Sequence, residues 1–109
     1  MRRVDLKPLS VNECWQGKRF KTKKYRDYEV ILRNRLPELK LPKPPYSVYY
    51  EFGFSSASCD LDNPIKPFQD VLQKVYGFND KDIFEMVAKR AKVKKGNEYI
   101  VFDIKTCEE

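Results

Sequence analysis

The sequence has 109 residues, of which 41% are hydrophobic and 35% charged, and its net charge is +6. This length supports one domain with one core, and no apolar run approaches the roughly 20 residues that a membrane-spanning helix needs. There is no histidine, and the three cysteines are scattered, which excludes Ser-His-Asp triads, Cys-His pairs and ordinary structural zinc sites. We expect a cytoplasmic protein without a signal peptide or a membrane partner.

The N-terminal third predicts a short strand, an irregular loop and one helix. Polar and apolar residues alternate over 2–6, as in a strand. Thr22 is a favourable N-cap for a helix from 23 to about 35. Tyr25 and Tyr28 lie on the apolar stripe of this helix, where their rings either pack in the core or stack on nucleic-acid bases.

The middle of the chain predicts a central strand and a second helix. Aromatic and apolar residues alternate with mostly small or polar ones over 46–54, after a proline-rich connector, which indicates a strand. Asn63 is a good N-cap and Pro64 suits the first helical position. The apolar spacing beyond them predicts a helix that ends at Gly77.

The C-terminal part predicts two more strands. Residues 82–94 fit both a helical and an alternating pattern, and we favour a strand. Gly96-Asn97 is a hairpin signal and 99–104 form a strand pattern, so we expect these two strands to pair as a hairpin with a basic tip. The fold class is therefore α+β, with a small mixed sheet of about four strands and two main helices packed on it.

Basic residues are bunched in two stretches of the sequence. Bunched positive charge in a small domain favours a polyanionic partner, usually nucleic acid, and a solvated surface is the alternative. The residues that we expect to contact nucleic acid are Lys18, Arg19, Lys21, Lys23, Lys24, Arg26, Lys92, Lys94 and Lys95.

Closely spaced carboxylates follow the central strand. Asp60 and Asp62 project the same way if their segment is extended, and Lys66 follows one turn later. Carboxylate oxygens suit Mg²⁺, which needs only one to three of them. Asp80 lies beyond the far end of the helix and joins this set only if the chain returns across a sheet edge. The alternative is that the first two aspartates form a turn and cap, and that Lys66 makes an ordinary ion pair at i±4.

Taken together, these residues resemble the RusA family of Holliday junction resolvases. Cys59 stands where relatives often have a basic residue, and Asp82 stands where they commonly have Gln. Looser similarity extends over most of the chain. The resemblance rests on features that follow one another in this order: Asp60-Leu61-Asp62-Asn63, then Lys66, a helix ending at Gly77-Phe78, and Asp80.

This resemblance implies a small Mg²⁺-dependent endonuclease, often encoded by phages or prophages, that resolves four-way DNA junctions in recombination and repair. Mn²⁺ is the expected substitute metal. The resemblance also implies that Asp60, Asp62 and Asp80 bind the metal and that Lys66 is catalytic, orienting water or offsetting charge on the phosphate. Two symmetric nicks need two active sites, which a homodimer supplies. The alternatives are a non-catalytic nucleic-acid-binding protein and a nuclease of the same fold that acts on other branched DNA.

Overall fold

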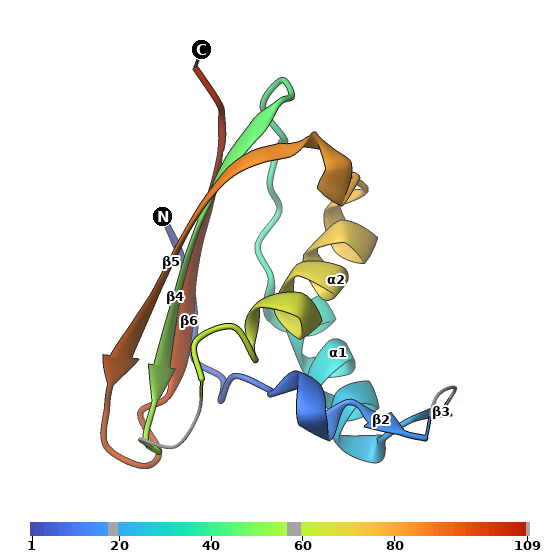
Figure 1. The fold of residues 1–109 in the computed structure, drawn as a ribbon, viewed down its shortest axis with the longest axis vertical. Helices are drawn as coiled ribbons and strands as arrows, with labels where there is room; N and C mark the ends of the chain where they lie inside the picture. The colour runs from blue at the N-terminus through green and yellow to red at the C-terminus, as the bar shows by residue number, and fades with distance from the viewer. Residues whose placement is uncertain (18–19, 57–59, 109) are drawn as a thin grey trace.

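In the computed structural model, which describes residues 1–17, 20–56 and 60–108, a four-stranded mixed sheet carries two α-helices on one face (Figure 1). A second, two-stranded sheet lies beside the first helix. This arrangement confirms the predicted α+β fold. None of the helices in the described part of the chain is long and apolar enough to cross a membrane.

The central strand of the main sheet is β4 (Tyr46–Phe54), with the bounds that its alternating residues predict. The strand order is β1-β6-β4-β5, in which β1 is Arg2–Val4, β5 is Ile83–Lys92 and β6 is Tyr99–Thr106. β4 pairs with β5 in parallel and with β6 antiparallel. Alternate β4 side chains are buried beneath the helices, which accounts for the period of two in the sequence.

The predicted pairing of the two C-terminal strands is wrong, although both strands are present. β5 and β6 lie on opposite sides of β4, so residues 93–98 cross the end of β4 and do not close a two-stranded hairpin. The Val93 amide donates to the Phe54 carbonyl at 2.9 Å, which ties this connection to β4. Placing β4 between them pairs its backbone groups on both edges, as a buried strand requires.

The first helix, α1 (Lys23–Arg35), has the predicted bounds. The Thr22 hydroxyl oxygen accepts a hydrogen bond from the Tyr25 amide at 3.2 Å, which satisfies one of the amides left open at a helix start. Tyr25 and Tyr28 are buried in the core. Of the two roles considered for these rings, the structure shows packing.

The second helix, α2 (Ile65–Tyr76), begins after Pro64, so the prediction that Asn63 is its N-cap is wrong. Pro64 occupies the cap position with a backbone that is already helical (φ −85°, ψ −11°). The Asn63 carbonyl accepts a hydrogen bond from the Val11 amide at 2.9 Å, and this residue thus makes a tertiary contact. Gly77 ends the helix at φ 75°, a conformation that glycine adopts without steric cost.

Phe68 fixes α2 over the sheet. Its ring meets the rings of Tyr50, Phe52 and Phe102 edge-on, at centroid distances of 5.4, 5.9 and 5.6 Å. All four side chains are fully buried. Aromatic pairs in this geometry contribute about 0.5–1.5 kcal/mol beyond the burial of their surface. The position of α2 then determines where the residues before and after it lie.

The small sheet was predicted as irregular loop. It pairs β2 (Trp15–Gln16) with β3 (Phe20–Lys21) after a 3₁₀ turn, η1 (Val11–Glu13). Two-residue strands are too short for alternation to reveal, so the sequence carries no periodic signal of this ribbon.

Candidate functional site

Asp60 and Asp62 lie in the turn that leads into α2, and both are exposed. The Asn63 amide donates to the Asp60 carbonyl at 3.2 Å, and the Ile65 amide donates to the Asp62 carbonyl at 3.3 Å. The segment is therefore a turn and not the extended stretch that we expected. Neither carboxylate forms an ion pair with a described residue, which leaves two adjacent negative charges in solvent.

Lys66 lies in the first turn of α2, and its ammonium contacts Asp70, four residues further along the helix. The Nζ to Oδ1 distance is 3.0 Å, and the Lys66 side chain is 63% exposed. Exposed pairs of this kind contribute only a few tenths of a kcal/mol. The amine is thus weakly held beside the start of α2 and is free to meet an incoming anion.

Asp80 lies at the opposite end of α2 from the 60–62 turn. It begins a second 3₁₀ turn, η2 (Asp80–Asp82), and the 12 residues of α2 alone span about 18 Å. The sheet also separates Asp80 from the 60–62 turn. Asp80 lies just before Ile83, which pairs with Tyr46 at the start of β4, whereas the 60–62 turn follows the end of β4. The three aspartates predicted as metal ligands do not meet within one chain.

One protomer therefore presents a pair of carboxylates, short of the predicted set of three. In the stretches that the structure describes, no three His, Cys, Asp or Glu side chains group closely enough to hold a metal ion. Asp60 and Asp62 offer hard oxygen donors that suit Mg²⁺, and this cation often takes only one or two carboxylates together with phosphate oxygens. The pair fits the predicted metal, and Asp80 of the same chain lies beyond its reach.

Three of the predicted nucleic-acid contacts lie at the same end of the sheet as this carboxylate pair. Lys92 ends β5, and Lys94 and Lys95 follow in the connection to β6. Because β4 and β5 are parallel, this connection lies where the chain leaves β4 toward the 60–62 turn (Figure 1). All three lysines are exposed, and none pairs with a carboxylate among residues 1–17, 20–56 and 60–108.

A second basic group surrounds Glu29 on α1. The Glu29 carboxylate is shared by Lys21, Lys74 and Arg33 at 3.3, 2.8 and 3.6 Å. Hydrogen bonds, chiefly from Lys74, hold the pKa of Glu29 below its usual value. Three cations on one carboxylate leave this surface positively charged. Lys74 and Arg33 were not predicted; the signal for Arg33 is its spacing of four residues from Glu29 along α1.

Three more of the predicted cations lie at the start of α1. Lys23, Lys24 and Arg26 are exposed in the first turn of α1, where Lys23 makes an i,i+4 pair with Asp27 at 3.1 Å. Lys18 and Arg19 lie outside the described residues. Their contribution to this surface stays a prediction.

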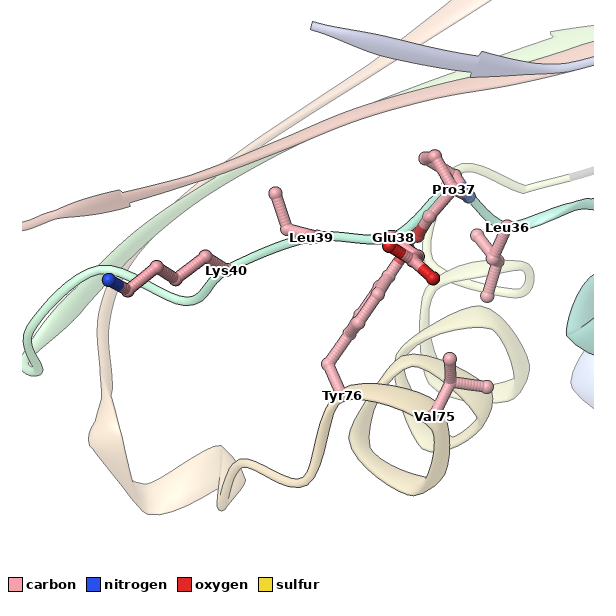
Figure 2. A pocket seen from close by; sticks show the side chains of 7 residues that line it. All are labelled: Leu36, Pro37, Glu38, Leu39, Lys40, Val75 and Tyr76. Carbon is pink, nitrogen blue, oxygen red and sulfur yellow. Dashed lines mark hydrogen bonds between the residues drawn. The ribbon is translucent and has the colours of Figure 1, made fainter.

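A groove of about 700 Å³ lies at the other end of α2, away from the carboxylate pair (Figure 2). The Tyr76 hydroxyl reaches across it and donates to the Pro37 carbonyl at 2.7 Å. The lining contains none of the predicted site residues, so we assign no chemistry to this groove. It is lined by Leu36, Pro37, Glu38, Leu39, Lys40, Val75 and Tyr76.

Neither a scan against protein-family models nor a search of curated proteins matches this chain. The resemblance to RusA resolvases therefore rests on the motif and its spacing.

Proposed function

We propose that the protein is a Mg²⁺-dependent endonuclease that cuts four-way DNA junctions as a homodimer. The observation that carries this proposal is the exposed pair of Asp60 and Asp62 at the end of the molecule where the lysines after β5 gather. Cations that attract a phosphate backbone would bring it against these carboxylates, and the repulsion is relieved when a divalent cation lies between them. The free thiols of Cys14 and Cys107 are in keeping with a cytoplasmic location.

In this proposal, Asp60 and Asp62 hold Mg²⁺, which supplies Lewis-acid chemistry at the scissile phosphate. Lys66 leaves its weak pair with Asp70 and offsets the negative charge that develops on the phosphate oxygens. The basic groups hold the flanking backbones through contacts that depend on salt and little on sequence.

A second copy of the chain supplies the third carboxylate. β5 is one of the two edge strands of the sheet, and it exposes Phe84, Met86 and Val87 by 67, 39 and 43%. An edge strand with exposed apolar side chains favours pairing with another strand. Asp80 precedes the start of β5, and the 60–62 turn lies near its other end. Antiparallel pairing of two β5 edges about a two-fold axis therefore brings Asp80 to the same end of the joined sheet as the partner's Asp60.

The proposal is tested with a synthetic four-way junction and Mg²⁺. We expect paired symmetric nicks, which Asp62→Asn abolishes while junction binding is retained. Glu38→Gln is the matched control, because it removes the same unit of charge at the far end of α2 and should cleave like the wild type.

Parallel reactions with forked and duplex DNA separate the alternatives. Preferential cutting of forks would indicate a nuclease of the same fold that acts on other branched DNA. Binding without metal-dependent cleavage of any of these substrates would leave a non-catalytic nucleic-acid-binding protein.

A further inference from the structure

Glu29 lies at the centre of three cations that come from three different elements. Lys21 belongs to β3, Arg33 to α1 and Lys74 to α2, and each contacts the Glu29 carboxylate within 3.6 Å. Among the residues that the structure describes, none of these cations contacts a second carboxylate. Three positive charges therefore surround a single negative one.

A structural clasp between α1 and α2 does not account for this excess of positive charge. One cation, such as Lys74 with its 2.8 Å contact, is sufficient to tie the two helices together through Glu29. Lys21 and Lys74 contact the same carboxylate oxygen, so their ammonium groups lie within about 6 Å of each other and repel. A second anion beside these cations relieves the repulsion, and the arrangement thus favours a negatively charged ligand.

The three cations are more exposed than the carboxylate that they share. The side chain of Glu29 is 20% exposed. The side chains of Lys21, Lys74 and Arg33 are 34, 39 and 49% exposed. Since an ammonium carries three N–H donors and a guanidinium five, each cation keeps donors that Glu29 does not use. A phosphate can therefore reach the cations from solvent while Glu29 stays the more buried partner.

The backbone of a nucleic acid is the anion that best fits the position of this group. Lys66, the candidate catalytic amine, precedes Lys74 by two turns of α2, a distance of about 12 Å along the helix axis. A DNA strand that contacts Lys66 can thus extend to the Glu29 group. Its regularly spaced phosphates neutralise cations that are spread over such a distance, and the net charge of the chain, +6, attracts it.

We propose that the Glu29 group binds a phosphate of the DNA backbone and that Glu29 competes with this phosphate for the three cations. The inference rests on the proposed function for the identity of the polyanion, and it deepens that function by assigning one backbone contact. Glu29 holds the cations in place when no DNA is bound and limits the affinity when DNA is bound. An endonuclease must release its cut DNA, and a carboxylate that takes back the cations makes this release easier.

The test measures binding to a four-way junction in EDTA, so that cleavage plays no part. Glu29→Gln keeps the shape of the side chain and removes its charge. We expect this variant to bind about tenfold more tightly, with a slope of log K against log salt that is steeper by about 1. The controls are Glu108→Gln and Lys105→Gln, which change exposed charges in and after β6, and each should alter the affinity by less than about twofold at moderate salt.

A double-mutant cycle with Lys74→Gln separates competition from a simple sum of charges. In the wild type, Glu29 attracts the Lys74 ammonium away from the phosphate, so Lys74→Gln should weaken junction binding only about threefold. In the Glu29→Gln background the same ammonium contacts the phosphate alone, and its loss should weaken binding about tenfold.

Equal affinities of Glu29→Gln and Glu108→Gln would overturn the site, and additive effects in the cycle would overturn the competition. Failure of the proposed nuclease has a different signature: the wild type then cleaves no branched DNA in Mg²⁺, while the cycle still decides the Glu29 group. A wild type that binds no DNA overturns both proposals. Thermal unfolding verifies that each variant is folded. If Glu29→Gln does not fold, Lys74→Gln is compared with Lys105→Gln, and equal affinities overturn the site.

Discussion

Glu51 organises its neighbours on the face of the sheet opposite the helices. It accepts hydrogen bonds from the hydroxyls of Tyr99 and Tyr49, the latter at 2.7 Å. These bonds, first that from Tyr99 and then that from Tyr49, lower the pKa of Glu51 and raise the pKa of both hydroxyls. The Arg3 guanidinium lies 4.3 Å from the centroid of the Tyr99 ring and completes the group.

The lowered pKa gives Glu51 a predictable effect on stability. A carboxyl whose folded-state pKa lies below the unfolded value of about 4.3 stabilises the fold above that pH, and the contribution disappears as pH falls through the folded-state pKa. We expect Glu51→Gln to be less stable than the wild type at pH 7 by about 0.5–1 kcal/mol, a value reduced by solvent screening. The difference should shrink as the pH is lowered below 4. Urea unfolding across this range measures it, and a difference independent of pH would contradict the assignment.

Because Gly53 on β4 has no side chain, the Tyr99 ring can pack directly against the backbone at this position. A Cβ atom at position 53 would lie 2.5 Å from two carbons of that ring, closer than real contacts allow. We expect Gly53→Ala to lower the free energy of unfolding by about 1–3 kcal/mol through overpacking. In a Tyr99→Leu background the same substitution should cost less. A double-mutant cycle in urea measures this coupling, and strictly additive effects would show that the ring is not the cause.

At the scale of elements, periodic patterns located the segments but not their neighbours. The alternation of β4 and the capped stripe of α1 predicted both sets of bounds, because each period follows one buried face. Gly96-Asn97 marks a reversal of the chain, but a local turn signal does not say which strand the chain returns beside. β4 lies between β5 and β6 because pairing depends on the burial of the whole strand.

The candidate site likewise combines features that the sequence predicts with features that depend on how distant segments are arranged. The charged residue types and the two basic stretches of the sequence could be located in advance, since they depend on single side chains, but Lys74 and Arg33 beside Glu29 were not predicted. The separation of Asp80 from the 60–62 turn could not be predicted, because it follows from the direction of α2 over a parallel pair of strands. The two-stranded sheet of β2 and β3 was missed because two-residue strands have no period.

The connection between β5 and β6 should contribute to DNA affinity through charge alone. We expect Lys94→Ala combined with Lys95→Ala to lower the slope of log K against log salt by about 2, with similar effects on junction and duplex. Filter binding or anisotropy from low to moderate salt measures the slope. Lys40→Ala combined with Lys43→Ala removes the same charge before β4 and is the control. An identical decrease for both pairs would mean that net charge, and not this connection, sets the affinity.

At the scale of the whole molecule, a site shared between two copies predicts complementation between inactive variants. Asp62→Asn and Asp80→Asn each break both sites of their own dimers. In a mixed dimer, one site combines the intact turn of one copy with the intact Asp80 of the other. Random pairing of equal amounts should therefore restore about a quarter of wild-type nicking, as single nicks.

The control for this experiment mixes Asp60→Asn with Asp62→Asn. Both changes affect the same turn, so every mixed dimer carries two broken sites and no activity should return. Nicking of a labelled junction after co-refolding of the two chains measures the outcome. If the first mixture stays inactive while its dimers form normally, Asp80 does not complete the partner's site.

The length of β5 has a further consequence for the proposed dimer. This strand of ten residues runs about 33 Å from η2 to the connection beside the 60–62 turn. In the proposed dimer, antiparallel pairing along this strand would hold the two candidate sites apart by about its length, which is close to one turn of duplex DNA, about 34–36 Å. The length of a single edge strand would then set the spacing of the paired cuts, and shortening that strand would bring the two cuts closer to each other.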